Sequence, residues 1–370
     1  MAELSTAILS ALAQTFAPDI KRQWNRTTHF LGAVNAVPGA TGPGAGKNVA
    51  FDVEFTGATA GTVAEGADVA STEYNSDVDV PAIFNWATYR SSFQISEQEV
   101  DMARTAIGSA DAIMNIFGNR ILGCSAQIAR AIETDCMTGT GVDANGNPTI
   151  VGIFGGALSA TGVYGGLNPA TYSEWASNVV ANGGVTRTLT PDLLSQADLL
   201  IFNAANIPWN LLVTTAGVVR KYESFFTMGN AFGTQQPLVR MNDSGANPQY
   251  GLGVQNNEQM QLGTMMTYKG YPVLRVPVAS TGKIAFLNTD HVKIKYLPHV
   301  PTQNEMEFFA KVGIQGSSGG MAPIQATGIP VRLVEIAKTG DSHKISMRVT
   351  IAMGVTRRNA CAVVSDISEV

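Results

Sequence analysis

Charged side chains are scarce in this chain. Asp, Glu, Lys and Arg together make up 14% of its 370 residues, against about 25% in a typical soluble protein. The scarcity does not come from membrane-spanning segments, because mean hydropathy is only +0.08 and no run reaches the ~18 apolar residues that a spanning helix needs. Since surfaces that face water normally carry more charge, we expect much of this surface to be covered by other subunits.

Basic residues and cysteines are also in short supply. The chain has 24 Lys+Arg against 29 Asp+Glu, which gives a net charge of -5, and it contains no basic run. This balance argues against tight nucleic-acid binding, which requires clustered positive charge. Cys124, Cys136 and Cys361 are odd in number and form no CxxC pair, so we expect reduced, buried thiols. The N-terminus lacks the basic region of a signal peptide.

Complete catalytic or cofactor motifs are absent as well. Gly46-Lys47 is followed by Asn48, where a phosphate-binding loop has Ser or Thr. Residues 316–320 match G-x-S-x-G, but Met-Ala-Pro follows where a helix is required. The acidic turn at residues 143–147 has its glycine at the wrong position for a calcium loop, and the four histidines show no metal-ligand spacing. We therefore expect no enzymatic activity, no cofactor and no metal site.

What the chain does have is a set of clear helical and strand patterns. Helices are expected where apolar residues recur at three- and four-residue spacing, and strands where they alternate. The expected helices cover residues 3–16, 96–137 and 190–203, and the expected strands cover residues 49–55, 77–89, 211–215, 271–278, 283–297, 331–338 and 345–355. Thr190 is expected to cap the third helix, with Pro191 in its first turn.

Residues 47–94 are expected to form an extended hairpin. A two-stranded hairpin alone is marginally stable in water, so it must lie on another surface. Between Lys47 and Arg90 there is no basic residue, whereas seven acids occur: Asp52, Glu54, Glu65, Asp68, Glu73, Asp77 and Asp79. Two interpretations stay open. The hairpin is either a solvated acidic loop, or it docks on another subunit that covers Phe51, Phe55 and Trp86.

Several segments occur in a recognisable order. Residues 115–122 through 132–135 look like a long spine helix, residues 182–184 leading into 189–192 look like the entry to an axial helix, and residues 268–273 and 286–291 look like central strands. In this order they resemble the major capsid proteins of tailed bacteriophages, which have the Hong Kong 97-type fold. The resemblance covers nearly the whole chain, although no single motif is diagnostic.

The resemblance implies an α+β capsid fold. Its parts would be an N-terminal arm at residues 1–46, the extended hairpin at residues 47–94, a peripheral domain at residues 95–165 and 325–370, and an axial domain at residues 166–324. The resemblance further implies a structural subunit, not an enzyme, that forms hexamers and pentamers of an icosahedral shell around double-stranded DNA. The implied location is the virion capsid, assembled in the host bacterial cytoplasm.

The resemblance also implies partners. These are a portal, a decoration protein and, because only about 46 residues precede the hairpin, a separate scaffolding protein. Packaged DNA would be contacted weakly and without sequence preference, since the chain lacks basic clusters. Contacts between subunits are expected through the seven hairpin acids and through Phe51, Phe55 and Trp86. The expected receiving residues are basic: Arg104, Arg120 and Arg130 of a neighbour's long helix, or Lys21, Arg22 and Arg26 of its arm.

Three other classes of protein stay open. A shell protein of a cellular nanocompartment shares the fold and would enclose an enzyme cargo. A phage tail or adhesin component would form fibres or rings. An enzyme with Ser318 as nucleophile would lose activity on Ser318→Ala.

Overall fold

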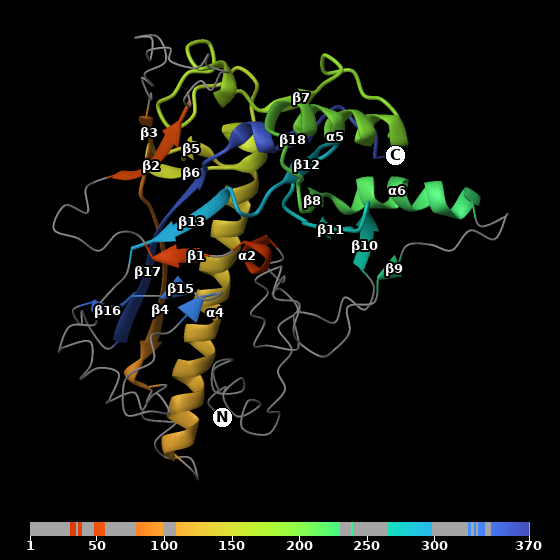
Figure 1. Ribbon diagram of the computed structural model, residues 1–370. Helices are drawn as coiled ribbons and strands as arrows, with labels where there is room; N and C mark the ends of the chain where they lie inside the picture. The colour runs from red at the N-terminus through yellow and green to blue at the C-terminus, as the bar shows by residue number, and fades with distance from the viewer. Residues whose placement is uncertain are drawn as a thin grey trace, which may run out of the picture. The chain divides into compact units, whose positions relative to one another are not determined.

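The computed structural model describes residues 30–34, 36–38, 48–55, 79–98, 109–229, 238–239, 265–297, 325–326, 329–330, 332–336 and 342–369. These residues fall into two compact units. Unit 1 takes the described residues within 88–132 and 296–351, and unit 2 takes those within 29–87, 133–295 and 352–369. Helix α4 (Ser109–Thr138) and strand β17 (Ser342–Val355) continue from unit 1 into unit 2 (Figure 1).

Strand β17 organises unit 1. Strand β16 (Arg332–Ile336) pairs with it antiparallel, in a register that places Leu333 opposite Met347, and strand β4 (Ala87–Ser96) also pairs with it. Every second residue from 345 to 351 is buried, as alternating side chains on a half-covered strand require. The final strand pair that the sequence predicts is therefore confirmed. Strands β14 (Gln325–Ala326) and β15 (Ile329–Pro330) form a separate two-stranded ladder.

Helix α4 confirms most of the long helix that the sequence predicts. Gly118 and Gly123 lie inside it without interrupting it, and Cys124 and Cys136 are free and buried, as expected. The preceding strand is longer than predicted, because the chain stays extended through Ser96, the last residue of β4, and residues 97–98 are helical, as the predicted helix start at residue 96 requires. The expected strand at 77–89 is two strands, β3 (Asp79–Asn85) and β4.

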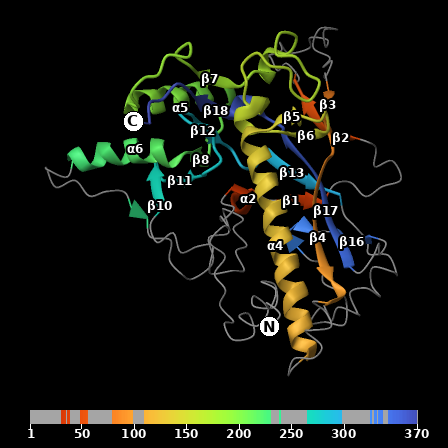
Figure 2. The ribbon, with the colours of Figure 1, turned by 180° about the vertical axis from the view of Figure 1, so that it is seen from behind.

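A seven-stranded mixed sheet lies in unit 2 (Figure 2). Its order is β7–β18–β12–β8–β11–β10–β9. The strands are β7 (Asn178–Val180), β18 (Ala362–Val364), β12 (Ile284–Leu287), β8 (Leu211–Thr214), β11 (Tyr271–Arg275), β10 (Met265–Tyr268) and β9 (Leu238–Val239). Every residue of β8 and β12 is buried, which is typical of strands covered on both faces. The buried strand predicted at 211–215 is confirmed.

Two helices pack their apolar side chains on this sheet. Helix α5 (Pro191–Ala205) begins as predicted, because Thr190 Oγ1 accepts a hydrogen bond from Leu193 N at 3.4 Å and Pro191 lies in the first turn. Helix α6 (Ala216–Gly229) was not predicted. Its first turn contains Gly217 and two valines, all with weak helix propensity, so packing and not local preference forms it.

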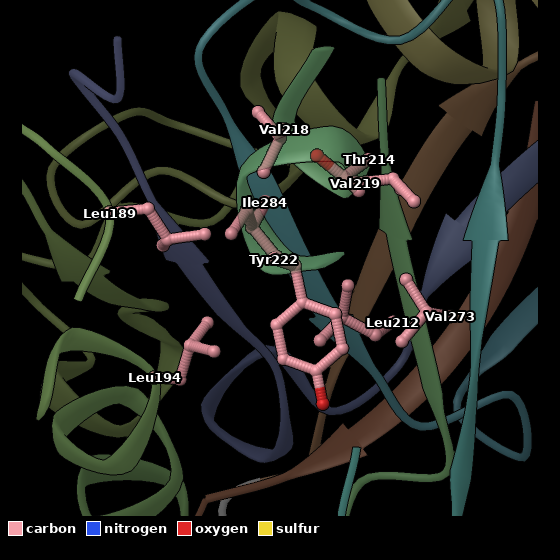
Figure 3. A pocket seen from close by; sticks show the side chains of 9 residues that line it. All are labelled: Leu189, Leu194, Leu212, Thr214, Val218, Val219, Tyr222, Val273 and Ile284. Carbon is pink, nitrogen blue, oxygen red and sulfur yellow. The ribbon is translucent and has the colours of Figure 1, made fainter. Parts of the chain in front are cut away.

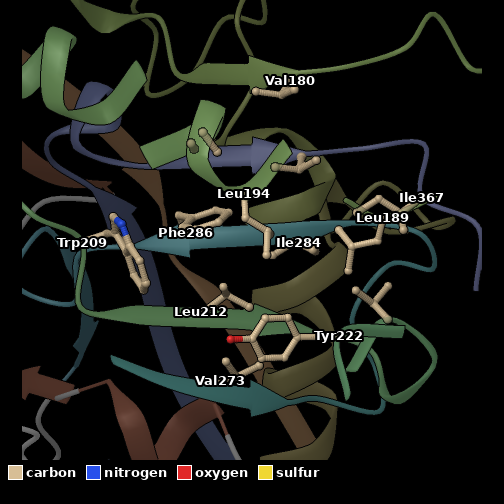
Figure 4. Packing of buried hydrophobic residues seen from close by; sticks show 14 of the residues in the cluster. Val180, Leu189, Leu194, Trp209, Leu212, Tyr222, Val273, Ile284, Phe286 and Ile367 are labelled. Atoms are coloured by element: carbon tan, nitrogen blue, oxygen red, sulfur yellow. The ribbon is translucent and has the colours of Figure 1, made fainter. Parts of the chain in front are cut away.

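The core of unit 2 lies between these helices and the sheet. Leu194 of α5, Tyr222 of α6 and Leu212 of β8 surround a small apolar cavity (Figure 3). The volume within the cavity that the centre of a water molecule can occupy is about 10 Å³. The cavity therefore has room for at most one water molecule and none for a ligand. Phe286 and Trp209 extend the same cluster, with their rings edge to face and centroids 5.0 Å apart (Figure 4).

Shorter elements complete unit 2. They are α2 (Phe30–Ala33), β1 (Ala36–Pro38), β2 (Asn48–Glu54), β5 (Thr140–Val142), β6 (Pro148–Val151), β13 (Val292–Tyr296) and the short helices η1 (Ile153–Ala157), η2 (Ser173–Trp175) and η5 (Arg358–Ala360). The strand expected at 283–297 is therefore two strands, β12 and β13. A turn separates them, in which His291 N donates to Asn288 O at 3.1 Å.

The acidic segment at residues 143–147 is a turn, as predicted. Asp143 accepts hydrogen bonds from the side chain of Asn147 at 2.8 Å and from the backbone N–H groups of Asn147 and Asn145 at 2.7 and 2.8 Å. These bonds, led by that from the Asn147 side chain, hold the pKa of Asp143 below its usual range. The expected helix at 3–16, Gly46-Lys47 and the segment 316–320 lie outside the described residues.

The cap of α5 can be tested directly. We expect Thr190→Ala to lower the free energy of unfolding by about 0.5–1 kcal/mol, because a backbone N–H loses its acceptor. Urea denaturation of the free subunit measures the change. Thr190→Ser keeps the hydroxyl and serves as the control, so an equal loss in both variants would contradict the capping role.

Candidate functional site

The structure places part of the expected contact residues at the base of the hairpin. It describes the side chains of Phe51, Asp52, Glu54, Phe55, Trp86, Arg120 and Arg130, and only the backbone of Asp79, which opens β3. The others, Lys21, Arg22, Arg26, Glu65, Asp68, Glu73, Asp77 and Arg104, lie outside the described residues. Arg120 is exposed and Arg130 is half-buried on α4.

We call the paired strands β2 and β3 the hairpin base, and its two faces differ in burial and charge. Strands β2 and β3 pair antiparallel, with Phe51 opposite Ala82 and Asp52 opposite Pro81. Along β2, Val49, Phe51 and Val53 are buried, whereas Asp52 and Glu54 are exposed. Because successive side chains of a strand point to opposite faces, the two acids share the outward face and the three buried residues share the inward face.

Phe51 finds its partners within its own chain. Its ring meets that of Phe84 edge to face, with centroids 5.6 Å apart. Lys295 Nζ lies 4.2 Å from the Phe51 ring centroid and donates to Ala50 O at 3.4 Å. Gly354 approaches so closely that a Cβ there would lie 2.5 Å from the ring. The contact therefore requires glycine at this position of β17.

Phe55 is half-buried by contacts within its own chain. It stacks on Tyr172 with centroids 4.4 Å apart and meets Trp175 edge to face at 5.9 Å. Trp86 is half-buried. Phe51 is therefore buried and Phe55 half-buried by residues of their own chain. That another subunit contacts these two rings and Trp86 stays a prediction.

Tyr164 links the hairpin base to β17. Its ring centroid lies 4.8 Å from that of Phe84, and its hydroxyl accepts a hydrogen bond from Val355 N at 3.1 Å. Burial raises the pKa of Tyr164, so the phenol stays neutral. The next residue, Gly165, accepts from Ile83 N at 2.8 Å. Its left-handed backbone (φ 61°) and its closeness to Phe84 leave no room for a side chain.

A buried arginine holds this segment in place. Arg358 is fully buried, and its guanidinium donates to the carbonyl oxygens of Ala157 at 2.7 Å, Ser159 at 2.5 Å and Gly162 at 3.5 Å. Burial lowers the pKa of Arg358 to about 10, so the group remains positively charged at neutral pH. The positive charge of Arg358 is thus stabilised by the backbone carbonyl dipoles of one loop, residues 157–162.

The same guanidinium packs against two aromatic rings. Its central carbon lies 5.1 Å from the ring centroid of Tyr164 and 5.5 Å from that of Trp175. Trp175 Nε1 in turn donates to Tyr164 O at 3.0 Å. We call Tyr164, Tyr172, Trp175 and Arg358 the hairpin platform. Its arrangement fixes the surface on which the hairpin base packs.

Lys295 gives the acidic hairpin a basic neighbour that the sequence did not reveal. Burial lowers the pKa of Lys295, and the charge of Lys293 lowers it further, whereas the Asp52 carboxylate opposes both effects. No spacing in the sequence connects Lys295 with the hairpin. The sequence contains one signal of the hairpin platform. Three aromatic residues lie within the turn-rich stretch 164–175, whereas an exposed loop would have mainly polar residues.

The arrangement supplies packing and orientation. In the part of the chain that the structure describes, no cluster of three or more His, Cys, Asp and Glu side chains could hold a metal ion. Among the described helices, none has the length and apolar character to cross a membrane.

Solved structures with a similar fold include two capsids and an encapsulin complex. The chain is similar to the capsid of cyanophage A-1(L), with a TM-score of 0.68 and 16% identity over 95% of this chain and 96% of that one. It is also similar to the capsid of a native GTA particle, with a TM-score of 0.52 and 14% identity over 95% and 96%. The SrpI encapsulin of Synechococcus elongatus gives a TM-score of 0.52 and 11% identity over 97% and 95%. The chain therefore has the α+β fold of capsid and related shell proteins.

The family follows from the sequence itself. The chain belongs to the SU10 major capsid protein family, whose model matches residues 43–368. It is a structural subunit of a virion capsid shell and not an enzyme, as the resemblance implied. A search of curated proteins gives no match.

The buried arginine should be the most sensitive position of the platform. We expect Arg358→Met to lower the free energy of unfolding of the subunit by at least ~3 kcal/mol, because each buried carbonyl left without a donor costs about 1–3 kcal/mol. Arg357→Met is the matched control, since Arg357 makes one such bond, to Ala205 O at 3.1 Å. Urea denaturation compares the two, and similar losses would contradict the role of Arg358.

The packing of the hairpin base within its own chain makes a second prediction. We expect Phe51→Ala to destabilise the free, unassembled subunit by about 3–5 kcal/mol, the usual cost of removing a buried aromatic ring. Ile83→Ala on the paired strand should cost less than ~1 kcal/mol, because Ile83 is 48% exposed. If Phe51→Ala left the free subunit unchanged and weakened only assembled particles, its cover would come from another subunit.

Proposed function

We propose that this chain forms the hexamers and pentamers of a closed icosahedral shell around double-stranded DNA. The family match over residues 43–368 carries the proposal, and the likeness to the cyanophage A-1(L) capsid supports it. The low content of charged residues agrees with a subunit whose surface is largely covered by copies of itself.

The finer division of the fold is part of this proposal. We assign residues 1–46 to an N-terminal arm, 47–94 to the extended hairpin, 95–165 with 325–370 to a peripheral domain, and 166–324 to an axial domain, in a Hong Kong 97-type arrangement. Helix α4 and β17 give the peripheral assignment its support. The strands of the large sheet that lie within residues 166–324 support the axial assignment, and β18 adds a strand to that sheet from the last segment of the chain.

The hairpin should contact a neighbouring subunit through its outward face. The inward face is anchored on the hairpin platform, so contact falls to the exposed acids Asp52 and Glu54 and to the hairpin acids outside the described residues. Their proposed receivers are the basic residues of a neighbour: Arg104, Arg120 and Arg130 of its helix, or Lys21, Arg22 and Arg26 of its arm. Exposed ion pairs contribute only ~0–1 kcal/mol each, so the acids would mainly set orientation.

The other partners remain proposals of the same kind. They are a separate scaffolding protein, a portal, a decoration protein and packaged DNA, with assembly in the host bacterial cytoplasm. The net charge of -5 supports weak, sequence-independent contact with DNA. A chain with more acidic than basic residues offers few cations to the DNA phosphates.

Sedimentation and electron microscopy test the assembly. We expect the purified chain to form oligomers of five and six subunits, and closed shells of uniform size when its scaffolding protein is present. Asp52→Lys/Glu54→Lys should weaken oligomer formation severalfold, because both changes reverse charge on the outward face. Glu174→Lys, an exposed acid in η2, is the control.

The outcomes separate the alternatives. A chain that stays monomeric at all concentrations, or that forms fibres, would contradict the shell. Closed shells of one size from the chain alone would contradict only the need for scaffolding. Particles that enclose an enzyme instead of DNA would indicate a nanocompartment, a function that the family match does not favour.

A further inference from the structure

Helix α5 leaves two large apolar side chains outside the core of unit 2. Its inward side is fully used, because Leu194, Ala197, Ile201 and Ala205 are all buried. Leu199, however, is 57% exposed and Phe202 is 61% exposed. Residues three positions apart are neighbours on a helix surface, so the two side chains form one patch, which we call the α5 patch.

The charged residue beside the α5 patch, Asp198, is already paired. Asp198 accepts a hydrogen bond from Trp209 Nε1 at 2.6 Å and forms an ion pair with Lys269 Nζ at 2.6 Å. The hydrogen bond to Asp198 raises the pKa of Lys269, so the pair stays charged and intact. A partner that covers Leu199 and Phe202 would therefore not bury an unpaired charge beside the patch. The cost of burying an unpaired charge is the usual obstacle to covering a surface that has charged residues at its edge.

The helix that carries the patch is held rigidly. Thr190 caps its start, Asn206 ends it in a left-handed conformation, and Ser195 lies 3.5 Å from the Tyr268 hydroxyl. A preformed apolar pair loses little conformational freedom on binding, and central aromatic anchors with a polar surround are typical of contacts that contribute strongly to affinity.

We propose that the α5 patch packs against a second copy of this chain. The inference rests on the proposed shell function, because a shell subunit has copies of itself beside it at all times. A permanent apolar pair is tolerated on a surface that is always covered, whereas a transient partner would leave it open to aggregation. DNA is disfavoured as the occupant, since Lys269 is already paired with Asp198 and Asp192 adds a negative charge to the same helix.

Sedimentation of purified subunits over a range of concentrations tests the proposal. We expect Leu199→Gln/Phe202→Gln to weaken self-association at least tenfold, which corresponds to about 1.4 kcal/mol. Gln has good helix propensity, so α5 itself should persist, and thermal melting by circular dichroism checks this. Leu199→Met/Phe202→Leu keeps the patch apolar and should associate within a few-fold of the wild-type chain.

A thiol-protection measurement provides a second, independent readout. The three native cysteines are buried, so the thiol introduced by Phe202→Cys should react alone with a water-soluble maleimide. We expect at least tenfold slower labelling in assembled particles than in dissociated subunits of the same variant.

The results distinguish two failures. If the wild-type chain associates and the Gln variant associates equally well, with rapid labelling of Phe202→Cys in particles, the α5 patch is not a contact and the shell function stands. If the wild-type chain never associates, both the patch contact and the proposed function are overturned.

Discussion

The burial of one positive charge, on the guanidinium of Arg358, is the constraint on which the hairpin base depends. Removing a cation from water costs several kcal/mol unless its donors are satisfied. The carbonyl groups that satisfy them come from the loop at residues 157–162, so that loop must adopt one conformation. The rings of Tyr164 and Trp175 are held against the same group, and Phe84 and Phe55 of the hairpin pack on those rings.

Unit 2 separates the contacts that fold the chain from the surfaces that remain available to other molecules. The inward face of β2 is covered by aromatic residues of its own chain, and the inward face of α5 closes the core. The surface that remains outside includes the acidic face with Asp52 and Glu54 and the apolar pair Leu199 and Phe202. Because the outward face of the hairpin lies on a rigid base, little conformational freedom is lost on binding. A small contact area can then fix the orientation of a neighbouring subunit.

Local patterns predicted the elements well and the site only in part. The alternation in β17 and the Thr190-Pro191 start of α5 are encoded within a few residues, and both could be predicted from the sequence. The cover of Phe51 and Phe55 could not, because Tyr172, Trp175 and Lys295 come from distant segments without periodicity. Arg358 carried no signal either, since a lone arginine near a strand normally indicates an exposed position. Helix α6 was missed because tertiary packing overrides the poor propensity of its first turn.

The position of β18 within the large sheet has a consequence for synthesis on the ribosome. This strand, at residues 362–364, lies between β7 and β12 and pairs with both, and α5 packs on β18 and β7. Until residue 364 has left the ribosome, β7 is separated from β12 in the sheet and α5 lacks its contact with β18. Pairings between such distant segments form late. A nascent chain that has not yet added β18 therefore carries no finished α5 surface.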